Sequence, residues 1–382
     1  MLLSLPVQAS GGAAIAGFGL PAIKPVPADG KLKPAITVAD PLGRPAWDEA
    51  LARWPAASPF HASPWLRTLS AAYGHQFWAI QCASPSADAP GALLLFGLVR
   101  SPLLGARLVS LPFADEAPLL GALEPAVGVR LLDAAVGLAA RLKCRFVEVR
   151  GSAGMPDGTP VFRGYHSHVL DLRSEEACLW QGGAAPVRTA VRHAERAGVK
   201  VSFLNTRAAV ADYYELHCRS RRRQGAPPQP WSFFSALAGQ VVEPGHGFVA
   251  LAVAPDGARP CAGAIFLRHR DQAVYKFGAS NESGRRLRAN NLLMWRAVCE
   301  LRGAGAGRLH FGRTDLDHAG LRRFKLGWGA AEFPLHYHRL AVNSRQYQQA
   351  GAPGLNWAGA IWRSLPDWLN RAAGRWLYRH LH

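Results

Sequence analysis

Polar and basic side chains are concentrated between Tyr275 and Gly329, where the sequence reads YKFGASNESGRRLRANNLLMW and, further on, FGRTDLDHAGLRRFKLGWG. The first run starts as a strand, and alternation along it predicts that Lys276 faces away from both Tyr275 and Phe277. Ser280 follows where that strand ends. We therefore expect the chemistry of this protein in the segment from Tyr275 to Gly329.

A helix begins after this strand, behind the basic, glycine-containing loop GRRLRANN. Either Asn290 or Asn291 suits its N-cap position, because asparagine side chains accept hydrogen bonds from the first free backbone amides. Free amides and basic side chains at a helix N-terminus bind phosphate or stabilise an anionic oxygen. Helix caps occur in most proteins, so this feature indicates anion binding only together with its neighbours.

The next strand ends in a second charged cluster, within GRTDLDHAGLRRFKLGWG. Strand ends beside such loops are where the active sites of α/β proteins are usually built. A structural role is the alternative, because the stem of a lysine in FKLGWG can pack on the aromatic rings beside it. The charged members of the cluster are Arg313, Asp315, Asp317, His318, Arg322, Arg323 and Lys325.

The elements that would position these residues occur twice along the chain. The first copy has the strands GALLLFGLVR and ARLVSLPF, the helix VGVRLLDAAVGLAARLK and the strand CRFVEVRG. The second copy, about 160 to 170 residues later, reads CAGAIFLRHR, AVYKFGAS, NNLLMWRAVCELRGAG and GRLHFGR. We predict a mixed α/β (α+β) fold of tandem duplicated domains, each a mixed twisted sheet flanked by helices. Coincidence is the alternative, since strands and helices alternate in many α/β proteins.

Composition divides the chain into four parts. Residues 1–44 are rich in Pro, Gly and Ala without a sustained period, which predicts a flexible leader and a fold that starts near Trp47. We assign residues 45–175 to the first domain and residues 176–340 to the second. Residues 341–382 form a Trp- and Arg-rich amphipathic tail, with a break between two short helices at Pro366. Residues 351–382 either pack on the domains or contact a bilayer surface.

Two helices are predicted between the copies. The run EEACLWQGGAAPVRTAVRHAERAGVKV indicates one helix that ends at Gly198 and carries a stripe of arginines. The run AAVADYYELHCRSRRR indicates another, which ends in arginines ahead of the stiff loop QGAPPQPW. Arginines cap a helix C-terminus favourably, but the rigid loop beside them suggests a binding surface. Candidate substrate-binding residues here are Arg221, Arg222, Arg223, Gln229 and Trp231.

Composition and missing motifs limit the classes of function that this protein can have. The net charge of +18 favours a polyanionic or phosphate-bearing partner, unless the arginine content only reflects a GC-rich genome. Motifs of P-loop nucleotide hydrolysis, dinucleotide binding, serine hydrolysis and zinc proteolysis are absent. The six cysteines are far apart, which predicts reduced thiols. The pairs His166/His168 and His336/His338 favour ordinary strand histidines over a metal site. The first residues form neither a convincing signal peptide nor a membrane span, so the cytoplasm is the default compartment.

The run DYYELHCRSRRRQGAPPQPWSFF, with YKFGAS, NNLLMW, FGRTD and GLRRFKLGWG, resembles the FemAB-like branch of the GNAT acyltransferase superfamily. Over about residues 45–340 the chain is similar to bacterial members associated with exopolysaccharide or exosortase (PEP-CTERM) gene clusters. The resemblance implies tandem GNAT-like domains, acyl-CoA or aminoacyl-tRNA as donor co-substrate, and no tightly bound cofactor. The chain lacks the coiled-coil arm of tRNA-using Fem proteins and the Q/RxxGxG/A loop of acetyl-CoA-dependent enzymes, so the donor stays open.

Acyl transfer to an amine, which the resemblance implies, requires a neutral nucleophile, a stabilised oxyanion and a route for the proton. We assign Arg313 and Lys325 to the anion, Asp315 or Asp317 to the proton or the acceptor amine, and Tyr275 to the leaving group as an acid. Tyr275, Arg313 and Lys325 are then expected to line one cleft. Further candidate substrate-binding residues are Lys276, Ser280, Asn290, Asn291 and Arg323.

We expect a cytoplasmic N-acyltransferase or aminoacyltransferase, free or peripheral at the inner face of the membrane. Its acceptor would be a small or lipid-linked amino-sugar or peptide precursor of the envelope or of an exopolysaccharide. The rival is a non-catalytic GNAT-like binding or scaffolding protein in membrane-associated polysaccharide assembly, because fold does not fix function. DNA is not an expected partner. The first copy lacks the basic run of the second, so we expect chemistry in the second domain and a cleft-shaping role for the first.

Overall fold

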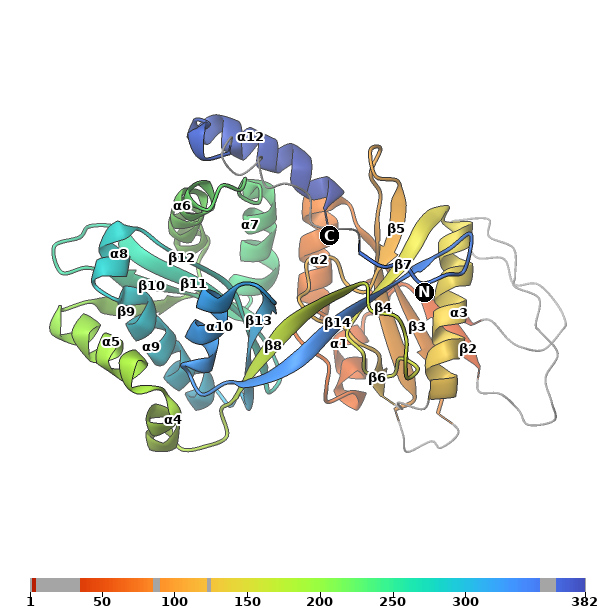
Figure 1. Cartoon of the computed structure of the whole chain (residues 1–382), viewed down its shortest axis with the longest axis horizontal. Coiled ribbons are helices and arrows are strands. Elements are labelled where there is room, and N and C mark those ends of the chain that lie inside the picture. The colour runs from red at the N-terminus through yellow and green to blue at the C-terminus, as the bar shows by residue number, and fades with distance from the viewer. Residues whose placement is uncertain (1, 5–34, 85–89, 122–124, 351–361, 382) are drawn as a thin grey trace, which may run out of the picture.

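The computed structural model describes residues 2–4, 35–84, 90–121, 125–350 and 362–381. Its centre is a 14-stranded mixed sheet with helices packed on both faces (Figure 1). The predicted mixed α/β fold is confirmed. The sheet runs through the whole molecule, so both halves of the chain share it.

The first half of the chain contains the elements β1 (Leu2–Ser4), β2 (Ile36–Ala39), α1 (Trp47–Ala50), a 3-10 turn (Leu51–Arg53), α2 (Ser63–Tyr73), β3 (Gln76–Cys82), β4 (Ala92–Val99), β5 (Ala106–Val109), β6 (Leu120–Gly121), α3 (Pro125–Arg141), β7 (Cys144–Arg150) and β8 (Arg163–Asp171). Strands β2 to β5 are antiparallel neighbours. β7 then pairs with β5 in parallel, because α3 carries the chain back along the sheet.

The second half repeats this order with the elements α4 (Glu176–Gly182), α5 (Ala185–Arg196), β9 (Lys200–Leu204), α6 (Arg207–Arg223), α7 (Trp231–Leu237), a π-helical turn (Ala238–Val242), β10 (Gly247–Val253), β11 (Pro260–His269), β12 (Gln272–Ser280), α8 (Glu282–Arg286), α9 (Ala289–Gly303), β13 (Arg308–Asp315), α10 (Ala319–Leu326), β14 (Ala331–Ala341), α12 (Asp367–Leu377) and a final 3-10 turn (Tyr378–His380). Strands β9 to β12 are antiparallel neighbours, and β13 pairs with β12 in parallel.

The two repeats exchange their last strands. β8, from the first half, pairs with β13 of the second half, while β14 pairs with β7 of the first. β8 and β14 also pair with each other and join the two halves at the centre of the sheet (Figure 1). Side chains from both repeats therefore meet along these two strands.

Helices from both halves share one hydrophobic core. Residues of α2, α6 and α7 pack together on one face of the sheet, around Trp65, Tyr213, Phe233 and Phe234. The opposite face is covered by α3 over the first repeat and by α5 and α9 over the second. A core shared between repeats fixes the position of the first half against the site of the second.

Two expected boundaries differ from the structure. The strand β2 lies inside the predicted leader, so the fold includes residues before Trp47; residues 5–34 lie outside the described part of the chain. The single helix expected up to Gly198 is two helices, α4 and α5. Gly182 and Gly183 end the first, and Pro186 starts the second, where proline is tolerated. Arg188 donates to the carbonyl of Gln181 (3.0 Å) and so caps α4.

The described part of the tail packs against the domains. Arg371 binds Glu215 of α6 (2.9 Å), and Asp367 binds Arg222 (2.9 Å). A Cβ on Gly374 would lie 2.0 Å from the carbonyl oxygen of Pro228, so only glycine permits this close approach. Pro366 is the N-cap residue of α12, as the predicted break requires, whereas residues 351–361 of the tail lie outside the described part of the chain. Among the described residues, no helix is long and apolar enough to cross a membrane.

Candidate active site

The parallel strands β12 and β13 part after three paired positions. Their register ends with Val274 opposite His310. A bulge at Lys276 in β12 and another around Gly312 in β13 then turn the strands away from each other. Among the described strands, the edge of β12 beyond Val274 therefore has no partner on this side, and its backbone amides and carbonyls face a gap.

The bulge at Lys276 overturns the predicted alternation along β12. Tyr275 packs into the core below α5 and α9, whereas Phe277 packs against the core of α2, α6 and α7. The Nζ atom of Lys276 lies 5.7 Å from the centroid of the Phe277 ring, on that same side. The prediction that Lys276 faces away from both neighbours was wrong, because one extra residue resets the two-residue period of the strand.

Buried charges from both repeats meet beside this gap. Lys276 Nζ donates to the carbonyl of Phe113 (2.7 Å) and binds Asp115 Oδ2 (3.2 Å). Arg313 donates to Tyr337 Oη (2.8 Å), which in turn donates to the carbonyl of Asp115 (2.7 Å). A cavity of about 140 Å³, which we call the Lys276 cavity, lies among these charges. It is lined by Tyr73, Phe113, Ala114, Asp115, Arg150, Gln229, Phe233, Lys276, Phe277 and Arg313.

Burial and neighbouring charges oppose each other at the Asp115–Lys276 pair. Burial raises the pKa of Asp115, but Lys276, Arg313 and His310 lower it, and the net result is a pKa below the ordinary aspartate value. Burial lowers the pKa of Lys276, and Asp115 opposes this shift. Asp115 is therefore a carboxylate at neutral pH, and its charge holds the ammonium of Lys276 in place.

The loop that carries Asp115 and Glu116 is strained and firmly held. Leu111 and Phe113 have φ angles of 55° and 61°, which bulky residues rarely adopt. The guanidinium of Arg150 donates to the carbonyls of Leu111 (3.3 Å) and Ala114 (2.7 Å) inside the loop. Such strain persists where surrounding contacts determine the backbone, and here it points Asp115 and Glu116 at the second repeat.

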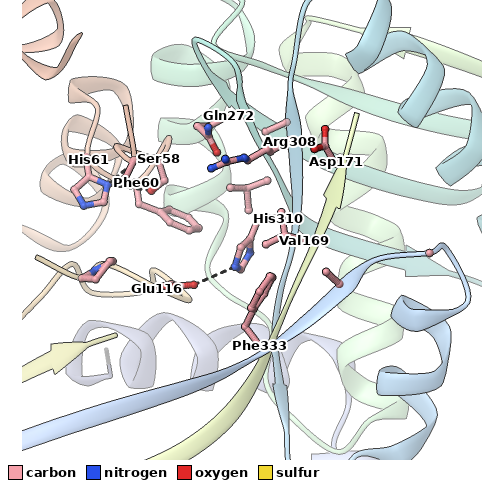
Figure 2. A pocket seen from close by; sticks show the side chains of 16 residues that line it. Ser58, Phe60, His61, Glu116, Val169, Asp171, Gln272, Arg308, His310 and Phe333 are labelled. Atoms are coloured by element: carbon pink, nitrogen blue, oxygen red, sulfur yellow. Dashed lines mark hydrogen bonds and ion pairs between the residues drawn. The ribbon is translucent and has the colours of Figure 1, made fainter. Parts of the chain in front are cut away.

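A larger cavity, of about 560 Å³, lies between the two repeats on the same face of the sheet (Figure 2). His61 and Phe60 contribute from the first half, and Arg308, His310 and Asp171 from the ends of β13 and β8. We call it the His310 cavity. Burial lowers the pKa of His61 to about 4, so this imidazole is neutral at physiological pH.

Glu116, His310 and Ser167 form a hydrogen-bonded group at this cavity. His310 Nε2 lies 3.3 Å from Glu116 Oε2, drawn as a dashed line in Figure 2, and 2.9 Å from Ser167 Oγ. Ser167 Oγ also donates to Glu116 Oε2 (3.2 Å). His310 Nδ1 accepts the backbone N–H of Gly312 (2.9 Å), so in the neutral ring Nε2 carries the proton. His310 cannot then take a proton from Ser167, and the Glu116 carboxylate is the hydrogen-bond acceptor of the group.

Comparison with protein families gives a match for the second repeat. Residues 184–337 match the family described as an acetyltransferase (GNAT) domain. This segment is a GNAT domain. It contains β12, β13 and the gap between them, and the family that it matches is one of acetyltransferases. Comparison with curated protein sequences finds no match.

A solved structure extends the likeness beyond residues 184–337. FemX is 14% identical, with a TM-score of 0.59, over 75% of this chain and 94% of that chain. A tandem GNAT protein from the clavulanic acid biosynthesis pathway is 15% identical, with a TM-score of 0.49, over 81% and 99% of the two chains. The L-PGS structure from Bacillus licheniformis is 13% identical, with a TM-score of 0.49, over 85% and 97%. At these identities the likeness to FemX shows a shared fold.

The residues expected to share one cleft are distributed around the GNAT domain. Arg313 lines the Lys276 cavity, but Tyr275 and Lys325 line neither this nor the His310 cavity. Burial raises the pKa of Tyr275 to about 12. Lys325 Nζ donates to the carbonyls of Gly312 (2.6 Å) and Arg313 (3.0 Å), and burial lowers its pKa to about 8. The structure thus gives Lys325 a place beneath the bulge of β13, and its anion-binding role stays a prediction.

The other predicted site residues lie in several parts of the second repeat. Gln229 and Lys276 come together at the Lys276 cavity. Asp315 and Asp317 are exposed just before α10 and Arg323 is exposed in its last turn, and their roles stay predictions. Arg221 donates to Tyr378 Oη (3.2 Å) and Arg222 binds α12, so both hold the tail. Arg223 donates to the carbonyl of Ser280 (3.2 Å), and Trp231 packs on Tyr214.

The predicted cap of α9 was wrong. Neither Asn290 nor Asn291 precedes the helix; the N-cap residue is Arg288, in a left-handed conformation, and no side chain caps the helix. Asn281 instead caps the short helix α8, within the basic loop. Asn290 donates to Ser280 Oγ (3.0 Å) and ties the helix to the end of β12. Among the described residues, no group of three or more His, Cys, Asp or Glu side chains could hold a metal ion.

Sequence reasoning did not find Asp115, Glu116, His310 or Tyr337. Asp115 and Glu116 follow β5, and the copy containing them was expected only to shape the cleft. The sequence did contain a signal for Asp115 and Glu116. The acidic run ADEA comes directly after a strand of the first copy, and the second copy has polar residues at the corresponding place. His310 lies inside the strand GRLHFGR, for which only a place in the repeat was predicted.

Proposed function

We propose that the protein transfers an acyl group from a thioester donor to an amine bound in the His310 cavity. The observation that carries this proposal is the position of Glu116 and His310, directly beside the point where β12 and β13 part. The unpaired edge of β12 suits the amides of an extended donor arm, since backbone groups there lack a strand partner among the described strands. Acyl-CoA is the donor that fits this edge.

The loop at the end of β12 supports a phosphate-bearing donor. Arg285, Arg286 and Arg288 are exposed there, next to the N-terminus of α9. Arginine side chains and free helix amides both favour phosphate groups. Aminoacyl-tRNA is the alternative donor, because it also combines phosphates with an activated acyl carbon.

The reaction forms one C–N bond and breaks one C–S bond. The amine loses a proton to the Glu116 carboxylate, its nitrogen attacks the thioester carbon, and the proton passes to the departing thiolate. The Lys276 ammonium lies 5.0 Å from the ring centroid of Phe60, a residue of the cavity wall, and supplies positive potential for the oxyanion. His310 holds Glu116 in place through Nε2.

The chemistry of the cavity wall favours an amino sugar or peptide amine as acceptor. Glu116 and Asp171 offer carboxylates for an ammonium group, and Phe60 and Phe333 offer rings for an apolar face. We propose a precursor of the envelope or of an exopolysaccharide, free or lipid-linked. FemX, with the same fold, supports the assignment only at the level of architecture.

The proposal is tested by incubating the protein with labelled acyl-CoA or charged tRNA and a panel of amino sugars and peptides. We expect release of free CoA that depends on both the amine and the protein, and appearance of label in the amine. A protein that turns over neither donor with any amine would instead be the scaffolding protein that is the rival interpretation.

The outer face of α12 supports contact with a membrane surface. Trp368 and Trp376 are 68% and 53% exposed on it, beside exposed Arg375 and Arg379, while the opposite face is fixed to α6. Tryptophan and arginine at such positions insert into the interface of anionic bilayers. We propose that the protein is peripheral at the inner face of the membrane.

Replacing Trp368 and Trp376 together with alanine is expected to weaken binding to phosphatidylglycerol vesicles about tenfold or more, because both rings lose their contact with the interface. Vesicle co-sedimentation measures this. Leu316→Ala is the matched control, since Leu316 is 60% exposed but lies away from α12. Equal sedimentation of the wild type and the double variant would exclude α12 as the contact.

A further inference from the structure

A third cavity, of about 470 Å³, belongs to the first repeat and is lined by three arginines from three neighbouring strands. Arg107 comes from β5, Arg145 from β7 and Arg339 from β14. The neutral polar residues Asn343, Ser344 and Gln348 complete its polar wall. None of the residues that line this Arg107 cavity is acidic.

The Arg107 cavity occupies the place that the His310 cavity has in the other repeat. In the strand register, Arg339 lies opposite Glu148 and Ala341 opposite Phe146. The second repeat has the equivalent pairs Val169 opposite His310 and Asp171 opposite Arg308. The duplicated position has therefore diverged: where one cavity has the carboxylate of Asp171, the other has Ala341, and where one has Val169, the other has Arg339.

Positive charge exceeds negative charge around the Arg107 cavity. Glu148 is 2% exposed and binds both Arg150 (3.2 Å) and Arg339 (2.5 Å). Arg107 is also 2% exposed and donates to the carbonyl of His380. Burial lowers the pKa of Arg107, and Arg339 and Arg150 lower it further against the opposing effect of Glu148. Three arginines around one carboxylate, Arg107, Arg150 and Arg339, give an excess of positive charge in a partly desolvated place, which an anion would neutralise.

We propose that the Arg107 cavity binds the phosphate or diphosphate group of an organic ligand. Guanidinium groups donate to phosphate oxygens in pairs, and Asn343, Ser344 and Gln348 add neutral hydrogen-bonding groups. The volume exceeds that of a phosphate and leaves room for a further part of the ligand. Phe146 is the aromatic residue of the cavity wall, with Arg339 stacked on its ring at 4.1 Å. A nucleotide and a phospholipid headgroup both have this chemistry.

Isothermal titration of the full chain with uridine diphosphate and with inorganic pyrophosphate, and co-sedimentation with vesicles containing phosphatidic acid, test the site. The test variant is Arg145→Ala, since Arg145 is exposed and its removal leaves the buried Glu148 contacts intact. We expect binding to weaken about tenfold or more, as for loss of a charge-assisted hydrogen bond. The control is Arg196→Ala, which removes the same charge from the exposed face of α5 and is expected to bind like the wild type.

The three probes distinguish the source of the phosphate. Tighter binding of uridine diphosphate than of pyrophosphate, lost in Arg145→Ala, supports a nucleotide. Binding to phosphatidic acid vesicles that is weaker in Arg145→Ala than in Arg196→Ala, without binding of the soluble probes, supports a lipid headgroup. The proposal is overturned if no probe binds the wild type, or if Arg145→Ala binds like Arg196→Ala. No acyl donor is present in these measurements, so their outcome does not depend on the proposed acyl transfer.

Discussion

Replacing Glu116 with glutamine is expected to lower kcat for acyl transfer about 100- to 10,000-fold, the usual loss when a general base is removed. Glutamine has the same size and still accepts hydrogen bonds from His310 and Ser167, but it cannot take a proton from the amine. His310 cannot replace it, because Nδ1 already accepts the backbone N–H of Gly312. Steady-state kinetics with the acyl donor and acceptor that the turnover assay identifies measure the effect.

Two measurements separate the base role of Glu116 from a structural one. The melting temperature of Glu116→Gln should equal that of the wild type, because the hydrogen bonds to His310 and Ser167 are kept. Glu49→Gln, on an exposed position of α1, is the matched control and should retain full kcat. A variant with normal kcat and a raised KM would contradict the base role, since Glu116 would then only bind the ammonium.

The repeat was readable from the sequence because local patterns determine it. The helix of the run NNLLMWRAVCELRGAG and the strand of AVYKFGAS have periodic apolar residues that bury one face, and both appear where the pattern predicts them. The same local reasoning failed at Lys276, where an extra residue in β12 shifts the period. Periodicity gives no sign of such a bulge, since it depends on contacts with β11 and β13.

The candidate site was harder to predict because two distant segments build it. Asp115 and Glu116 come from a loop of the first repeat, whereas Lys276 and His310 belong to the second. The exchange of β8 and β14 brings these segments together, and nothing in either segment alone indicates this pairing. The sequence therefore led to the second copy as the whole site, and to Lys325 as an anion-binding group, although its ammonium already contacts two carbonyls.

Replacing Asp115 with asparagine is expected to lower the free energy of unfolding by about 3 kcal/mol. The substitution leaves the ammonium of Lys276 without its carboxylate, next to Arg313, in a place where Lys276 is only 9% exposed. Chemical denaturation measures the loss. Asp256→Asn, on an exposed turn, is the matched control and is expected to change stability by less than about 0.5 kcal/mol.

The pH dependence of stability gives a second measurement of the same pair. The pKa of Asp115 is lower in the folded protein than in the unfolded chain. Its stabilising contribution is therefore fully present above the unfolded pKa, about 3.9, and is lost as the pH falls through the lower folded value. The acid limb of the stability profile should be shallower in Asp115→Asn than in the wild type.

A double variant shows whether the loss comes from the unpaired ammonium. In Asp115→Asn with Lys276→Met, both charges of the pair are absent, so the combined loss should be smaller than the sum of the two single losses by about 1 kcal/mol or more. Additive losses would mean that the two side chains stabilise the fold independently. The loop at Asp115 would then be held chiefly by Tyr337, which donates to the carbonyl of Asp115 and accepts from Arg313.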